Sequence, residues 1–95
     1  MNLAEIKTYL SLHPEAVLVD VRSPEHYQAG HLEGAINMPL ATLSERQGEL
    51  SMAQPVIVYC NLGITSQKAM DYLQAAGFEY VMQLEGGLKG QGEHE

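Results

Sequence analysis

Two short apolar runs limit the folds that this chain can adopt. The segments "AVLVDV" (16–21) and "PVIVY" (55–59) are almost continuously apolar and rich in β-branched residues. Neither alternates with polar residues as a half-exposed strand would, and each is too short for a typical helix. Strands that are buried on both faces have this character, and they occur mainly in parallel sheets covered by helices. The two runs therefore predict the centre of a parallel sheet.

Helical and strand-like patterns alternate around these two runs. Asn2 and Glu5 have the spacing of a capping box, and Ser23 before Pro24 is typical of a second helix start. Helices are predicted over 2–10, 23–30, 41–50 and 65–77, and further strands over 34–40 and 80–84. A chain that alternates strand and helix in this way predicts an α/β fold with a mainly parallel sheet.

The composition is that of an ordinary globular protein, with 45% hydrophobic and 18% charged residues. Because the chain contains no repeat, low-complexity tract or linker, we expect residues 1–95 to form one domain, with 91–95 as a frayed tail. Twelve acidic and five basic side chains give a formal net charge of −7. This charge argues against nucleic acid and against an anionic membrane surface as partners.

The chain holds a single cysteine, Cys60, so no internal disulfide can form. The first residues lack the features of a signal peptide, and no apolar run is long enough for a membrane span. A cytoplasmic location is therefore predicted.

Cys60 lies in "VIVYCNLGITSQ" (56–67), where a predicted strand passes through a short loop into a predicted helix. A cysteine at this place is often only a small buried hydrophobe. The loop also favours reactivity, because ligands in parallel sheets bind beyond the carboxyl ends of strands. Asn61 and Gly63 tolerate a positive φ, and Thr65 and Ser66 are typical helix caps. Such a loop would surround the sulfur with amides at a helix N-terminus and so stabilise a thiolate or another anion.

Spacing argues against two other cysteine chemistries. A dithiol redox site needs a second cysteine, and the chain has none. A phosphatase-type loop generally has an arginine six positions after the cysteine to bind phosphate, and here that position is Ser66. No arginine follows Cys60 in the chain, so phosphoryl chemistry is not expected.

The segment 20–39, "DVRSPEHYQAGHLEGAINMP", and the cysteine loop with its helix and closing "GG" resemble the single-domain rhodaneses, a family of sulfurtransferases. The resemblance implies a parallel sheet of four or five strands with helices on both faces. It also implies that Cys60 is the catalytic nucleophile and carries a persulfide, loaded from a donor such as thiosulfate and passed to cyanide or a thiol. It requires no cofactor and no metal. Expected partners are therefore a small sulfur-containing anion or thiol, and a sulfur-relay protein.

The six-residue loop of this family corresponds here to residues 60–65, a length associated with sulfur rather than phosphate. The residues expected to bind the substrate are Asn61, Leu62, Gly63, Ile64, Thr65 and Ser66. Many relatives have a basic residue in or just after this loop. This loop is uncharged, so its amides must bind the anion, with help from Lys68 in the first helical turn.

Several other residues have a simpler interpretation. Asp20 and Arg22 are expected to form a structural ion pair, and His31 to fix a turn rather than act as a base. His13 and His26 show no metal-ligand spacing. An apolar rim is expected at the site, made of Leu62, Ile64 and Leu88. Two alternatives to the enzyme stay open: a persulfide carrier or protein-binding module with little thiosulfate turnover, and an inactive relative with a structural cysteine.

Overall fold

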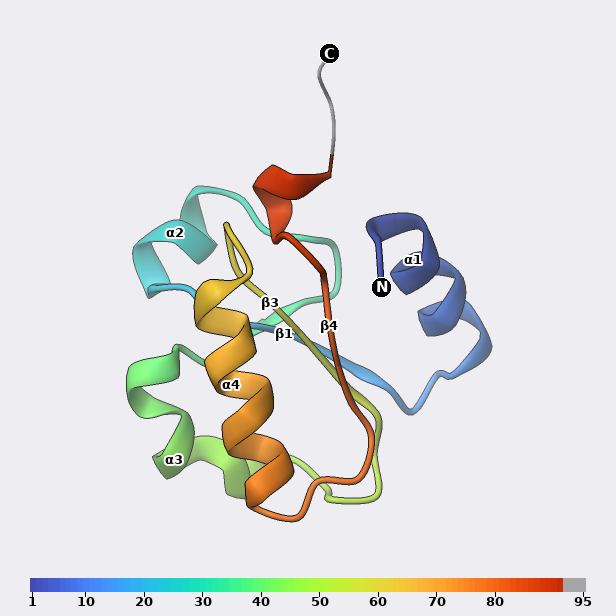
Figure 1. Cartoon of the computed structure of the whole chain (residues 1–95), viewed down its shortest axis with the longest axis vertical. Coiled ribbons are helices and arrows are strands. Elements are labelled where there is room, and N and C mark those ends of the chain that lie inside the picture. Colours follow the sequence, from blue (N-terminus) through green and yellow to red (C-terminus); the bar gives the residue numbers. More distant parts are fainter. Residues whose placement is uncertain (92–95) are drawn as a thin grey trace.

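The computed structural model describes residues 1–91 and contains four parallel strands with helices on both sides (Figure 1). The strands are β1 (Val17–Asp20), β2 (Ile36–Asn37), β3 (Val56–Tyr59) and β4 (Val81–Gln83). The α-helices are α1 (Leu3–Leu12), α2 (Pro24–Ala29), α3 (Leu43–Arg46) and α4 (Ile64–Ala75). Three 3-10 turns, η1 (Leu40–Thr42), η2 (Gln47–Glu49) and η3 (Leu88–Gly90), complete the described elements. The α/β fold with a parallel sheet is confirmed.

The sheet has the order β2-β1-β3-β4, which places the two apolar runs at its centre. Every residue of β3 is fully buried, as a strand covered on both faces requires. Val56 and Val58 face the core cluster that includes Ala69 and Leu73 of α4. Ile57 and the ring of Tyr59 face the second cluster with α1. Figure 1 shows α1 on one side of the sheet and α3 and α4 on the other.

The predicted helix caps form as expected at the first two helices. The Asn2 side chain accepts from the Glu5 amide at 2.8 Å, and the Glu5 carboxylate accepts from the Asn2 amide at 2.8 Å. Ser23 Oγ accepts from the His26 amide at 3.3 Å, with Pro24 as the first helical residue. Both caps satisfy amides that have no partner inside the helix.

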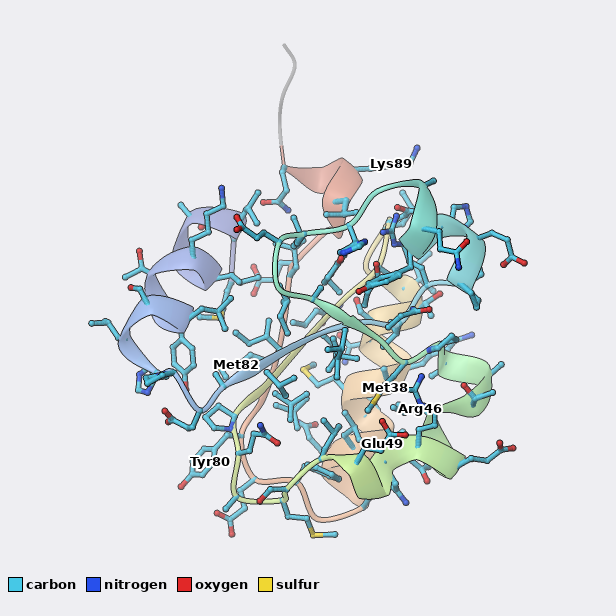
Figure 2. The ribbon with its side chains drawn as sticks, turned by 180° about the vertical axis from the view of Figure 1, so that it is seen from behind. Met38, Arg46, Glu49, Tyr80, Met82 and Lys89 are labelled. Carbon is cyan, nitrogen blue, oxygen red and sulfur yellow. The ribbon has the colours of Figure 1, made fainter. Side chains whose placement is uncertain are left out.

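The predicted helix 41–50 is wrong as one continuous element. It divides into η1, the four-residue α3 and η2, because it buries little more than Leu43 and Leu50 and lacks a continuous apolar stripe. Arg46 of α3 donates to the carbonyl of Asn37 at 2.6 Å, which ties α3 to the carboxyl end of β2. Arg46 also pairs with Glu49 at 3.0 Å, near the buried Met38 (Figure 2).

Register brings the loops that form the site side by side. Asp20, the last residue of β1, pairs with Tyr59, the last residue of β3. The chain therefore leaves both central strands at the same edge of the sheet, at Val21 and at Cys60. No helix among residues 1–91 is long and apolar enough to cross a membrane. Of the tail expected to fray, 92–95 lie outside the described residues; the side chain of Gln91 donates to the carbonyls of Glu85 and Gly87.

Candidate active site

Three hydrogen bonds surround the sulfur of Cys60, which directly follows β3. The amides of Gly63 and Ser66 donate to Cys60 Sγ at 3.1 and 3.2 Å. The Ser66 hydroxyl lies 3.3 Å from the same sulfur. Cys60 is only 3% exposed and Ser66 is fully buried, so water competes little for these bonds.

These contacts act on the ionisation of the thiol in opposite directions. Burial raises the pKa of Cys60, because a charged sulfur is poorly solvated inside the protein. The Ser66 hydroxyl and the amides of Ser66, Gly63 and Leu62 lower the pKa, because they stabilise the thiolate. Together they outweigh burial, and the pKa of Cys60 lies below its ordinary value. The amide-lined loop inferred from the sequence thus has the electrostatic effect it was expected to have.

The conformation of the loop differs from the prediction at three residues. Gly63 has the positive φ of 91°, whereas Asn61 does not adopt a positive φ. Gly63 is also the N-cap of α4, so Thr65 and Ser66 lie inside the first turn and do not cap it. Because the helix starts at Ile64, Ser66 lies in its first turn, where its side chain meets the sulfur. The prediction of caps at Thr65 and Ser66 was therefore wrong.

The segment after β4 supports the loop from outside. The amides of Leu88 and Lys89 each donate at 2.9 Å, the first to the carbonyl of Cys60 and the second to that of Asn61. Gly87 lies so close that a Cβ there would be 2.3 Å from the Asn61 carbonyl oxygen. Gly87, in the closing "GG", thus lets a second backbone approach the cysteine loop directly.

A pocket of ≈ 450 Å³ opens above the loop. Its lining residues are Val21, Arg22, Ser23, His26, Cys60, Asn61, Leu62, Ile64 and Thr65. Of the residues predicted to bind the substrate, Asn61, Leu62, Ile64 and Thr65 line the pocket. Gly63 and Ser66 do not line it, and they contact the sulfur through their hydrogen bonds instead.

Asp20 and Arg22 form the ion pair that the sequence predicted. Arg22 Nη2 lies 2.7 Å from Asp20 Oδ2, and the side chains are 8% and 0% exposed respectively. The hydrogen bond to Asp20 raises the pKa of Arg22 further. Arg22 also donates to the side chain of Asn61 at 3.3 Å and to the carbonyl of Gly30 at 2.7 Å. The pair therefore connects β1, the end of α2 and the cysteine loop.

Of three other residues considered in the sequence, His31 acts as predicted, whereas Lys68 and Leu88 lie away from the pocket. His31 approaches the Tyr27 carbonyl at 2.8 Å and stacks on the Tyr27 ring, which fits the predicted turn-fixing role. Lys68 is exposed and does not line the pocket. Leu88 packs against the core cluster on the α1 side, so the rim consists of Leu62 and Ile64 only. They are 60% and 63% exposed.

Two side chains of the site were missed in the sequence. His26 lines the pocket from α2, and Gln83 reaches the back of the loop from β4. The amide of Gln83 donates to Ser66 Oγ at 2.9 Å and to the Gly63 carbonyl at 2.8 Å. For Gln83, the one signal in the sequence was its polar side chain inside the strand-like "YVMQL". Among residues 1–91, His, Cys, Asp and Glu side chains form no group of three that could hold a metal ion.

Comparison with known proteins identifies the family. The model of the rhodanese-like domain matches residues 4–93. This chain belongs to the rhodanese-like domain family. It is 38% identical over 74 residues to the thiosulfate sulfurtransferase GlpE of Pseudoalteromonas translucida, covering 78% of this chain and 70% of that protein. The solved structure of the Alr3790 protein from Anabaena sp. superposes with a TM-score of 0.85 at 32% identity, over 93% of this chain and 70% of the other.

Another relative is a longer protein. YqhL of Bacillus subtilis (strain 168) is 37% identical over 75 residues, which are 79% of this chain and 60% of YqhL. The chain thus spans less than two thirds of that relative. The rhodanese-like fold expected from the resemblance is confirmed by the family match and by the superposed structure.

Proposed function

We propose that this protein is a sulfurtransferase that moves a sulfane sulfur through a persulfide on Cys60. The observation that carries the proposal is the sulfur itself, held by two amides and a hydroxyl and open to a pocket. The rhodanese-like family and relatives named thiosulfate sulfurtransferase support this class of enzyme.

The first step loads the cysteine. The Cys60 thiolate attacks the outer sulfur of a donor such as thiosulfate, and a new S–S bond forms to Cys60. The S–S bond within thiosulfate breaks, and its electron pair leaves with sulfite. The amides of Gly63 and Ser66 hold the negative charge near the loop without any change in their own protonation.

The second step transfers the sulfane sulfur from Cys60 to an acceptor. Cyanide or an acceptor thiolate attacks the outer sulfur of the persulfide and bonds to it, while the S–S bond to Cys60 breaks. The product is thiocyanate or a new persulfide, and Cys60 returns as a thiolate. Nucleophilic catalysis of this kind splits one transfer into two easier displacements. No residue is needed as a base, because the thiolate is stabilised before it reacts.

Mass spectrometry of the intact protein tests the proposal. Incubation with thiosulfate should add the mass of one sulfur atom, and subsequent cyanide should remove it. Cys60→Ser is the matched control and should gain nothing. If the wild-type protein gains no sulfur from thiosulfate or from a protein persulfide, or if Cys60→Ser transfers sulfur at the wild-type rate, the proposal is wrong.

One observation favours a second candidate, a carrier that receives its persulfide from another protein. Leu62 and Ile64 are largely exposed next to a cysteine that is almost covered. An exposed apolar pair beside a reactive group suits contact with a protein surface. In the same mass assay, a carrier would stay unloaded with thiosulfate and become loaded with a persulfide-bearing protein. The cytoplasmic location, the sulfur-relay partner and the single-domain organisation stay predictions.

A further inference from the structure

Gln83 connects β4 to the back of the cysteine loop. Its side-chain amide nitrogen lies 2.9 Å from Ser66 Oγ and 2.8 Å from the carbonyl oxygen of Gly63. Both partners in turn contact Cys60 Sγ, Ser66 through its hydroxyl and amide and Gly63 through its amide. Gln83 is half-buried and Ser66 is fully buried. A single side chain outside the loop therefore touches two of the groups that surround the sulfur.

The direction of these bonds follows from chemistry alone. The Gly63 carbonyl can only accept, so the Gln83 atom beside it must be the NH₂ nitrogen rather than the oxygen. One hydrogen of that NH₂ group goes to Gly63 and the other to Ser66 Oγ. Ser66 therefore accepts from Gln83, and its single hydroxyl hydrogen remains for another acceptor.

That hydrogen distinguishes the two states of Cys60. A thiolate can only accept, so the Ser66 hydroxyl donates to it and each hydrogen of the network has a partner. A thiol that donates to Ser66 Oγ takes the second lone pair of that oxygen beside Gln83, so the sulfur no longer accepts the Ser66 hydrogen in this buried place. An unused buried donor is costly, so the network stabilises the thiolate more than the thiol.

We propose that Gln83 is a positioning residue that directs the Ser66 hydroxyl at Cys60 and thereby favours the thiolate. Gln83 touches neither the sulfur nor the pocket, so it acts through Ser66 and the Gly63 peptide. The inference rests on the proposed function only for its catalytic meaning, since the state of the thiol can be measured without any sulfur donor.

The test is the rate at which iodoacetamide alkylates Cys60, followed over pH. Cys60 is the chain's one cysteine, so the signal has one source. Gln83→Met keeps the length of the side chain and removes both donors. We expect alkylation near neutral pH to slow about tenfold and its midpoint to move to higher pH. Without Gln83, the Ser66 hydroxyl is no longer held in the orientation that donates to the Cys60 thiolate. The rate at high pH, where every molecule is a thiolate, should stay at the wild-type value.

Two further variants distinguish this role from a general structural one. Gln83→Glu replaces a donor with a group that only accepts and adds a negative charge, so it should move the midpoint further in the same direction. Gln74→Glu makes the same change of charge at an exposed position of α4 and should leave the profile unchanged. The other ionisable groups lining the pocket, Arg22 and His26, are unaltered in all three variants.

The route through Ser66 is tested by a double-mutant cycle. In a Ser66→Ala background, Gln83→Met should lose most of its effect on the alkylation midpoint. An unshifted midpoint in Gln83→Met and Gln83→Glu would overturn the proposal, and so would a shift that persists undiminished without the Ser66 hydroxyl. A shifted midpoint in a protein that never takes up sulfur would leave Gln83 as proposed and reject the sulfurtransferase.

Discussion

Replacing Gly87 with alanine should distort the cysteine loop, which Gly87 contacts from the segment after β4. Gly87 has φ 68° and ψ −171°, a backbone region that almost only glycine adopts. A Cβ at this position would lie 2.3 Å from the carbonyl oxygen of Asn61 and 2.6 Å from the amide nitrogen of Leu62. These neighbours are backbone atoms of the loop, so no flexible side chain can move aside.

The expected loss of stability has two parts. The backbone strain costs about 1–3 kcal/mol. Forcing a methyl group into a filled space costs about another 1–3 kcal/mol. A domain of this size has a total free energy of unfolding of about 5–15 kcal/mol, so the loss is a large share of it. If the loop moves to relieve the clash, the bonds from Leu88 and Lys89 to the loop carbonyls weaken as well.

Urea unfolding and Cys60 alkylation together measure these effects. Two control variants separate the cost of backbone strain from the cost of the steric clash. Gly34→Ala also has a positive φ, 84°, but its Cβ would meet nothing within 4 Å, so it reports strain without a clash. Gly48→Ala has neither feature and should change the free energy of unfolding by less than about 0.5 kcal/mol.

We expect Gly87→Ala to be clearly less stable than Gly34→Ala, and its Cys60 to react more slowly at neutral pH. Equal stability of Gly87→Ala and Gly34→Ala, together with unchanged alkylation, would refute the close approach of the two backbones. A loss of stability with unchanged alkylation would show that the loop keeps its geometry and that the clash is relieved on the side of Gly87.

Three further predictions concern charge. Asp20→Asn should lower the free energy of unfolding in urea by about 3–5 kcal/mol, because it leaves the guanidinium of Arg22 buried without its charged partner; Glu49→Gln, in an exposed pair, should change it little. The midpoint of Cys60 alkylation should lie below the value of about 8.5 for a free thiol, and a midpoint at or above it would reject the amide-lined loop. Since the fold lowers the pKa of Cys60, the thiolate adds stability that is fully present above the ordinary thiol pKa and disappears as pH falls through the lowered value. The wild type should therefore gain stability relative to Cys60→Ala as pH rises through that window. A difference in the free energy of unfolding that does not change with pH would contradict this prediction.

The central sheet could be predicted because its signals are local. The β-branched runs contain β1 and β3, and Cys60 directly follows the second run. The parallel sheet type then indicated that this carboxyl end of β3 is where a ligand would bind. Asn2 and Ser23 could be assigned as caps for the same reason, since a cap acts within three residues of itself. The helix predicted at 41–50 was wrong because its weak apolar pattern left the outcome to packing against the sheet.

The residues that distant segments bring to the cysteine loop and the pocket could not be predicted, because those contacts depend on the fold. Gln83 meets Ser66 across 17 positions of sequence, and nothing near Gln83 indicates the contact. His26 reaches the pocket because β1 and β3 end at the same edge. Leu88 was assigned to the rim because it follows the two glycines, but the turn directs its side chain to the α1 side of the sheet. In each case the local sequence defines the residue's type and the fold defines its neighbour.

The absence of charge in the loop has a consequence for how a substrate is recognised. Arg22 is the guanidinium nearest the loop, and it is already paired with Asp20. The net charge of −7 gives a small anion no long-range attraction. The groups that contact the sulfur itself are amides and one hydroxyl, whose hydrogen bonds act only at short range. These groups therefore stabilise charge on a sulfur donor only once it has reached the loop. Under the second candidate proposed above, the exposed Leu62 and Ile64 would supply an apolar contact at the pocket for a protein that carries the sulfur.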